Sequence, residues 1–170
     1  MTNKQKFKPE AIRKRTGSRL AALQFCYSRQ MSEDSFAHTL DGFRTSYLDE
    51  ILKQLTIKKI DEEHFTALIT GVDTETDRLD GQIEPLLRQG WTMARLGTHE
   101  LSILRLGCYE LQSLPHIPAL AIISEYAAIA EEFNADTGFI NAVLDQLARH
   151  LRAIEMKACL LYTSPSPRDS

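Results

Sequence analysis

The chain has 170 residues, 43% of them hydrophobic, and a formal net charge of −3, a composition that predicts one globular domain with a buried core. Its longest apolar run, residues 117–123, is interrupted by Pro118 and is far shorter than the ~20 residues that a membrane helix requires. The basic N-terminus is not followed by the apolar stretch of a secretory signal. We therefore expect a soluble cytoplasmic protein with no membrane segment.

Charge is distributed unevenly along the chain. Residues 1–19 contain seven basic side chains and one acidic one, a net charge of +6, which leaves −9 for the rest of the chain to give −3 overall. The basic residues are Lys4, Lys6, Lys8, Arg13, Lys14, Arg15 and Arg19. A basic arm on an acidic body is the electrostatic footprint of nucleic-acid binding, although a solvated tail has the same composition. We expect residues 1–12 to form a flexible basic arm.

The first predicted helix covers residues 14–30. Its core stripe recurs at spacings of 3, 4 and 4 and consists of Leu20, Leu23, Tyr27 and Met31. Basic side chains crowd its first turn, where they oppose the positive end of the helix dipole, and Gly17 weakens the turn further. We expect these turns to become ordered when an anionic partner binds.

Residues 32–58 have the weakest pattern of the chain. Ser32 or Asp34 is a candidate helix cap, and the apolar period fits one broken helix or two short ones equally well. Asp61 is a stronger start signal, because Ile60 and Phe65 are spaced as a hydrophobic staple around it. We expect one helix over 61–72.

A further helix is predicted over 76–88, where Pro85 should end or kink it. The only tryptophan, Trp91, follows, and we expect it to anchor this connection against the next helix.

Residues 95–112 form the predicted central helix of the fold. They carry two apolar stripes on nearly opposite sides: Leu101, Leu104, Cys108 and Leu111 on one, Ile103 and Leu106 on the other. A helix with two apolar faces is held between neighbours. Thr98 is the expected N-cap, with Glu100 in the first turn. Glu110 projects between apolar positions, and we expect it to form a structural ion pair rather than to act as a catalytic acid.

Two more helices follow Pro115 and Pro118, over 119–133 and from about Thr137, with Asn134 as a left-handed cap between them. Roughly seven helices result and no strand pattern competes with them, so the fold class is all-α. Residues 13–155 form the domain. The helical period stops in residues 156–170, whose Ser-Pro-Ser-Pro run cannot be helical. We interpret this tail as non-native adapter or frame-shifted sequence, or as disordered, and set it aside.

No motif of catalysis, cofactor binding or metal binding is present. The chain lacks a phosphate loop, GxGxxG, HExxH, CxxC and a nucleophile elbow. Its five histidines lie on different predicted elements, and an odd count of three cysteines argues against a disulfide framework. Cys26 and Cys108 fall on apolar faces, so we expect buried thiols. The sequence indicates a protein that is not an enzyme and has no metal or cofactor.

Five blocks, in order over residues 13–150, resemble the NusB family of bacterial transcription antitermination factors. They are SRLAALQFCYS at 18–28, DEEHFTALITGV at 61–72, RLGTHELSILRLGCYEL at 95–111, IPALAIISEYAAIAEEF at 117–133 and FINAVLDQL at 139–147. Residues 32–58 match poorly and the tail does not match.

The resemblance implies seven helices in two sub-bundles, and binding of boxA RNA together with NusE, a ribosomal small-subunit protein. It implies a role in the RNA polymerase antitermination complex on ribosomal RNA operons, and a possible homodimer. The RNA-binding residues that it implies are Arg13, Lys14, Arg15, Arg19, Tyr27 and Phe139. The partner-binding residues that it implies are Tyr27, Glu100 and Asp136. Tyr27 also fits a core position with its hydroxyl at the rim, and Glu100 also fits a position that serves only the helix dipole.

Two rival hypotheses remain. NusB-like domains also resemble the N-terminal part of ribosomal RNA cytosine methyltransferases, so the chain is alternatively the RNA-binding domain of a truncated enzyme. A helical adaptor that binds only protein is the third hypothesis.

Overall fold

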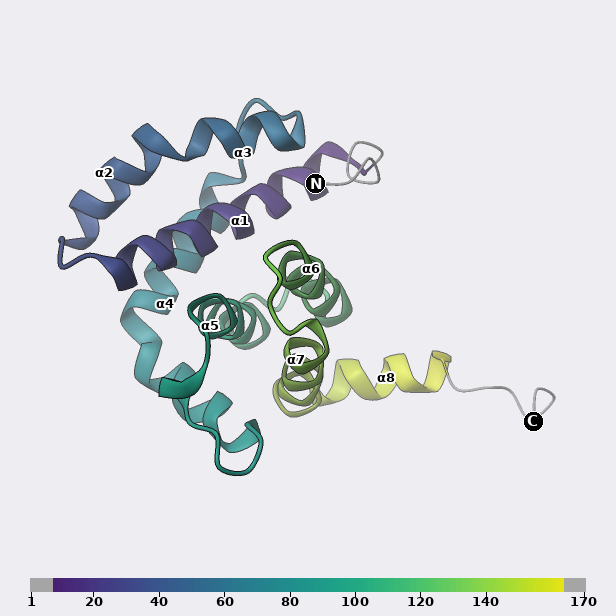
Figure 1. The fold of residues 1–170 in the computed structure, drawn as a ribbon. Coiled ribbons are helices and arrows are strands. Elements are labelled where there is room, and N and C mark those ends of the chain that lie inside the picture. The colour runs from purple at the N-terminus through teal and green to yellow at the C-terminus, as the bar shows by residue number, and fades with distance from the viewer. Residues whose placement is uncertain (1–7, 164–170) are drawn as a thin grey trace.

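Eight α-helices and two 3₁₀ turns make up residues 8–163, the range that this computed structural model describes, and no strand occurs in that range (Figure 1). The helices are α1 Glu10–Met31, α2 Phe36–Ser46, α3 Leu48–Leu55, α4 Glu62–Ile83, α5 Thr98–Ser113, α6 Ala119–Glu132, α7 Thr137–Leu151 and α8 Ala153–Thr163. The 3₁₀ turns are η2 Glu84–Leu86 and η3 Met93–Arg95. The all-α prediction is confirmed, with α8 in addition to the seven helices expected.

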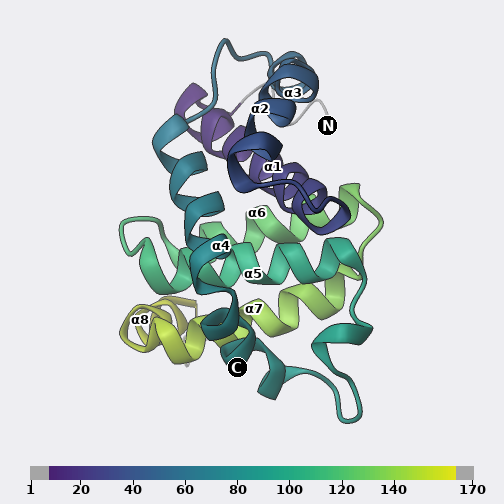
Figure 2. The same ribbon diagram turned by 90° about the vertical axis from the view of Figure 1, so that its left-hand side faces the viewer.

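Two sub-bundles share the long helix α4. Helices α1, α2 and α3 pack on one another and α1 packs on α4, whereas α5, α6 and α7 pack together with α8 against α7. Helix α5 contacts α1, α4, α6 and α7, and Figure 2 shows it across the middle of the molecule. Both predicted stripes of α5 are buried except for Leu101, which is partly buried. The prediction of a central helix held between neighbours is confirmed.

The first helix begins at Glu10, directly after Pro9, rather than at Lys14. Its turns are ordered in the free chain, because Gly17 packs against the loop that follows α3. A Cβ on Gly17 would lie 2.9 Å from Ile60 Cγ2 and 3.2 Å from Ile57 Cδ1. Gly17 is therefore a close-packing residue, and its interpretation as a weak point of the helix is wrong. Of the predicted flexible arm, residues 10–12 are helical and residues 1–7 lie outside the described range.

Residues 32–58 form two short helices rather than one. Neither Ser32 nor Asp34 caps α2; the Ser35 hydroxyl accepts from the His38 amide instead. Asp61 caps α4 as predicted, its carboxylate accepting from the His64 amide. Ile60 and Phe65 are both buried, as the staple requires.

The helices predicted over 61–72 and 76–88 are joined in α4, and the predicted break between them is a kink. The backbone leaves the helical region only at Glu75 (φ −113°, ψ 19°). Helix α4 ends at Ile83, and Pro85 lies in η2, as expected of a residue without an amide donor.

Three local predictions are wrong. Gly97, not Thr98, is the N-cap of α5, and it offers no side-chain hydrogen bond. Trp91, predicted to anchor the connection against α5, is 46% exposed. The helical period does not stop at residue 156: α8 runs to Thr163, and Met156 is 4% exposed. The non-native origin of the tail stays a prediction, and residues 164–170 lie outside the described range.

Candidate nucleic-acid interface

Three predicted site residues come together where α5 and α7 begin. Asp136 caps α7 by accepting from the Phe139 amide at 3.0 Å. The Asp136 amide in turn donates to Glu100 Oε1 at 3.3 Å. The N-cap chemistry of the sequence thus places Glu100, Asp136 and Phe139 around one hollow.

An aromatic row lies beside this cluster and includes Tyr27. The Tyr27 ring stacks on His99 with centroids 5.6 Å apart, and His99 lies 5.0 Å from Phe133. Tyr27 is partly buried. This exposure is compatible with a core position and also with contact to RNA or a partner protein. His99 and Phe133 were not among the predicted site residues. The row connects the ends of α1 and α6 with the start of α5, which Figure 2 shows on one side of the molecule.

The basic residues of α1 lie at the other end of that helix. Arg13 is used internally: its guanidinium donates to the Leu55 and Thr56 carbonyls at 3.0 and 2.9 Å, at the C-terminal end of α3. Lys14 forms an i,i+4 pair with exposed Glu10 at 3.5 Å. Arg15 is partly buried and has no ion pair within the described residues. Lys14 and Arg15 are therefore the α1 cations best placed to meet a phosphate.

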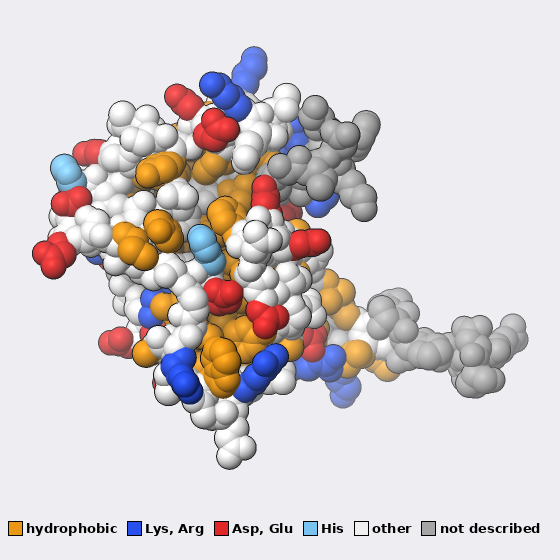
Figure 3. All heavy atoms as spheres, in the orientation of Figure 1, with side chains coloured by type: hydrophobic (Ala, Val, Ile, Leu, Met, Phe, Trp, Pro, Cys, Tyr) orange, Lys and Arg blue, Asp and Glu red, His pale blue; other side chains and the backbone are white. Residues whose placement is uncertain are grey.

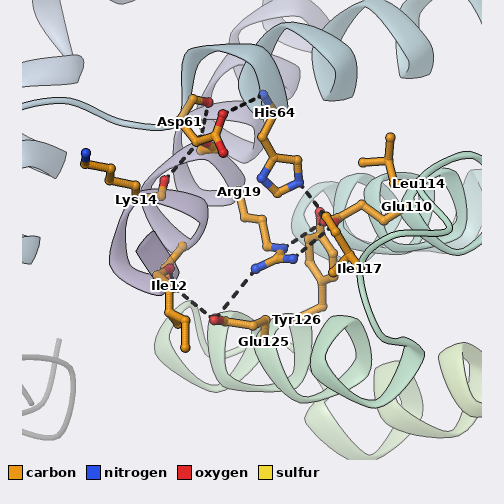
Figure 4. A network of polar contacts seen from close by, with 12 residues as sticks. Ile12, Lys14, Arg19, Asp61, His64, Glu110, Leu114, Ile117, Glu125 and Tyr126 are labelled. Carbon is orange, nitrogen blue, oxygen red and sulfur yellow. Dashed lines mark hydrogen bonds and ion pairs between the residues drawn. The ribbon is translucent and has the colours of Figure 1, made fainter. Parts of the chain in front are cut away.

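Arg19 is inside the protein and is removed from the predicted RNA-binding set. It is 2% exposed, and its Nε and Nη2 donate to the two Glu110 oxygens at 2.8 and 2.9 Å (Figure 4). An external RNA cannot reach this guanidinium, because the core covers it and its charge is already balanced by Glu110 and Glu125. The sequence held a signal for this: Thr16, Arg19, Leu23 and Cys26, at spacings of 3, 4 and 3, share one buried helix face.

Glu110 is the centre of a buried polar network. His64 Nε2 lies 3.1 Å from Glu110 Oε1, and the Tyr126 hydroxyl donates to Glu110 Oε2. Glu125 lies 3.7 Å from Arg19 and accepts from the Thr16 hydroxyl at 2.9 Å. Burial alone would raise the pKa of Glu110, but the hydrogen bonds and charges of His64 and Arg19 hold it at about 2. The structural ion pair predicted for Glu110 is confirmed.

The predicted RNA-binding residues thus fall into two groups at opposite ends of α1. Residues 13 and 27 are 14 positions apart, about 21 Å at 1.5 Å per residue. One nucleotide cannot contact both groups, so an RNA that uses both must run along the molecule. The hollow beside Glu100, Asp136 and Phe139 is also lined by three residues that were not predicted, Arg88, Trp91 and Arg95.

The burial of Cys26 and Cys108 confirms the prediction of buried thiols. Cys26 and Cys108 are 8% and 0% exposed, and burial raises the pKa of each to about 12. No helix between residues 8 and 163 is long and apolar enough to cross a membrane.

These features define a small all-helical protein of two sub-bundles, with aromatic and charged side chains gathered at helix ends. Residues 16–149 match the model of the NusB family, and the chain belongs to that family.

Curated relatives and solved structures agree with this assignment. A transcription antitermination protein NusB of Rhodopseudomonas palustris is 33% identical over 89% of this chain and 90% of its own length. One of Novosphingobium aromaticivorans is 32% identical over 81% of this chain and 95% of its own. The structure of T. maritima NusB is 26% identical, with a TM-score of 0.59 over 79% of this chain and 90% of that one. A structure of antitermination factors NusB and NusE with dsRNA has 23% identity, with a TM-score of 0.64 over 81% of this chain and 98% of that one, and shares the fold.

Proposed function

We propose that this protein is an RNA-binding transcription antitermination factor that acts by assembly and not by catalysis. The observation that carries the proposal is the match to the NusB family over residues 16–149, since the relatives are named antitermination proteins. A protein with the same fold is described in complex with NusE and dsRNA, and we extend both kinds of partner to this chain. With NusE it binds boxA-type RNA in the cytoplasm and joins the antitermination complex of RNA polymerase on ribosomal RNA operons.

The geometry supports two contact regions on the RNA. Lys14 and Arg15, with Lys8 beside them in the sequence, supply phosphate contacts at the start of α1. Tyr27 and Phe139 supply aromatic surface at the other end, where unpaired bases stack. Glu100 and Asp136 form the rim at which we place the contact with NusE. The rival methyltransferase hypothesis has no support from the relatives, which are named antitermination proteins.

The proposal is tested by electrophoretic mobility shift of boxA RNA and of a scrambled RNA, with and without NusE, across a salt series. We expect tighter binding of boxA with NusE present, and a log affinity that falls linearly with log salt. Equal and salt-insensitive binding of both RNAs would overturn the proposal. Binding of NusE with no RNA binding would favour the protein-only adaptor, and gel filtration of the free protein tests the homodimer.

Reversing the charge of Lys14 and Arg15 together should weaken binding to both RNAs and should flatten the salt dependence. Removing one cation that neutralises a phosphate reduces the slope of log affinity against log salt by about 1. Arg13 is left intact in this variant, because its bonds to the α3 carbonyls would confound charge with folding. Lys157→Glu, an exposed position on α8, is the control and should leave the slope unchanged. An unchanged slope in the Lys14/Arg15 variant would remove these residues from the interface.

A further inference from the structure

A hollow of about 390 Å³ lies where α1, α4 and α5 meet (Figure 2). Its floor is apolar and is formed by buried side chains of α1 and α4, namely Phe25, Ile69 and Val72. One side is closed by a hydrogen bond between helices, since Gln30 Nε2 donates to the Ser102 hydroxyl at 2.8 Å and joins α1 to α5. Hollows of this size hold small molecules in other proteins.

The hollow lies on a different side of α1 from the proposed RNA contacts. Arg29 lines the hollow and follows Tyr27 by two positions, so the two side chains point about 200° apart around the helix. In α5, Ser102 and Glu100 are separated in the same way. The hollow is therefore not part of the interface proposed for RNA and NusE.

One wall of the hollow carries an ion pair that is only partly satisfied. Arg29 Nη1 donates to the Asp34 carbonyl at 2.6 Å, and Arg29 Nη2 donates to Asp73 Oδ1 at 3.2 Å. Arg29 Nε is buried and has no hydrogen-bond partner within the described residues. No donor in that range bonds to Asp73 Oδ2. A guanidinium with unused donors thus lies beside a carboxylate with an unused oxygen.

The neighbouring ion pair is complete by comparison. Arg105 also lines the hollow, but its Nε and Nη2 donate to the two Asp80 oxygens at 2.8 and 2.7 Å. A bidentate pair of this kind occupies both oxygens of the carboxylate. Of the two arginines that line the hollow, Arg29 is therefore the one whose carboxylate partner can still accept from a ligand.

The edge of the hollow is acidic. Glu33 and Asp34 line it and are exposed, and acidic side chains lie over the connection between α1 and α2, at the left edge of Figure 3. Together with Asp73 they outnumber the two arginines, so a ligand that is only anionic meets a lining of net negative charge. A ligand that carries both charges finds a partner for each.

We propose that the hollow binds a small zwitterion, an α-amino acid with an apolar side chain. Its carboxylate accepts from the Arg29 guanidinium and its ammonium group donates to Asp73. Its side chain packs on the floor formed by Ile69 and Val72. The two charged groups of an α-amino acid are adjacent, as are those of Arg29 and Asp73, which lie 3.2 Å apart, so both contacts form in one orientation. This site goes beyond the proposed function and does not depend on it.

Leucine and two analogues that each lack one of its charges test the proposal on the full-length protein. Isotope-labelled protein is titrated at neutral pH with L-leucine, with isocaproate, which lacks the ammonium group, and with isopentylamine, which lacks the carboxylate. Amide chemical shifts are followed by NMR. We expect saturable shifts at Gln30, Val72 and Ser102. The affinity for leucine should exceed that for either analogue about tenfold, the contribution of one hydrogen bond to a charged group.

Asp73→Asn and Glu62→Gln form a matched pair of variants. Both carboxylates belong to α4, and each bonds to an arginine that lies over a phenylalanine ring, but Glu62 does not line the hollow. Asp73→Asn should weaken leucine binding about tenfold, the same contribution of one charged hydrogen bond. It should not weaken isocaproate binding, because it removes a negative charge. Glu62→Gln should leave both affinities unchanged.

Three results would overturn the proposal. The first is the absence of saturable shifts with leucine, or shifts confined to residues away from the hollow. The second is equal affinity for leucine and isocaproate, which would reduce the site to carboxylate binding. The third is an equal loss of both ligands in Asp73→Asn, which would remove the ammonium contact. Saturating leucine should leave the affinity for boxA RNA unchanged, since the hollow and Tyr27 lie on different sides of α1, and competition between the two would contradict this placement.

Discussion

Replacing Glu110 with alanine should lower the free energy of unfolding by about 3–5 kcal/mol, the usual cost of removing one partner of a buried ion pair. The substitution leaves the Arg19 guanidinium, 2% exposed, with only Glu125 at 3.7 Å to balance its charge. The Tyr126 hydroxyl also loses its acceptor. Urea unfolding followed by circular dichroism measures the change.

The Asp80–Arg105 pair offers a matched control. Its two hydrogen bonds, at 2.8 and 2.7 Å, resemble those of Arg19 and Glu110, but the side chains are 24% and 17% exposed. Asp80→Ala should therefore cost about 1 kcal/mol or less. If Glu110→Ala costs no more than Asp80→Ala, Glu125 alone compensates Arg19 and the importance assigned to Glu110 is wrong.

The same carboxylate predicts a pH dependence. Its pKa in the fold is about 2, below the ordinary value of 4.5, so its charged form is favoured in the folded state. The stability that it contributes is fully present above about pH 4.5 and is lost as the pH falls toward 2. The difference in unfolding free energy between the unsubstituted protein and Glu110→Gln should shrink over this window. A difference that stays constant down to pH 2 would contradict the assignment.

Helix periodicity was sufficient to predict most of the fold. The two stripes of α5, the cap at Asp61 and the left-handed residue Asn134 (φ 55°) were all visible in local spacing. These features depend on residues within one or two turns of each other. The break predicted between residues 72 and 76 lies at the kink at Glu75. The cap at Gly97 was missed because glycine has no side chain that could signal a cap.

The site was less predictable because its parts are distant in the sequence. Arg19 and Glu110 are 91 positions apart. Arg19 was counted among the RNA-binding residues, although its helix face is buried. Trp91 was expected to anchor the connection against α5, because large aromatic side chains usually supply packing contacts. In the fold it lies on a turn that ends beside α7, and only the three-dimensional arrangement places it next to Phe139.

Arg152→Ala should destabilise the protein by about 3 kcal/mol, because partly buried hydrogen bonds from a charged donor to carbonyls contribute more than bonds between neutral groups. Arg152 is 8% exposed and donates to four carbonyls at the end of α5 and in the connection to α6. These belong to Leu111, Ile117, Glu110 and Leu114. The last carbonyls of a helix have no partner within it, so the guanidinium acts as their cap.

The neighbouring Arg149 provides the control for this prediction. It is 50% exposed and, among the described residues, pairs only with Asp145, one turn earlier on α7, so Arg149→Ala should cost about 0.5 kcal/mol or less. Arg152→Lys should fall between the two, since an ammonium has three donors and no planar fork. Equal midpoints for Arg149→Ala and Arg152→Ala in urea would refute the capping role.

Arg152 also tests whether stability and RNA binding are separable in this fold. Its Nη1 pairs with Glu155 at 2.7 Å, and Glu155 accepts from the Ala119 amide at 2.7 Å, so the two residues join the end of α5 to the start of α6. The proposed contact residues Glu100, Asp136 and Phe139 lie around the opposite end of α5. At a temperature where the variant stays folded, Arg152→Ala should therefore bind boxA RNA with unchanged affinity. A parallel decrease of affinity and stability would instead show that the α5–α6 junction positions the binding surface, because α5 is the rigid element that the two ends share.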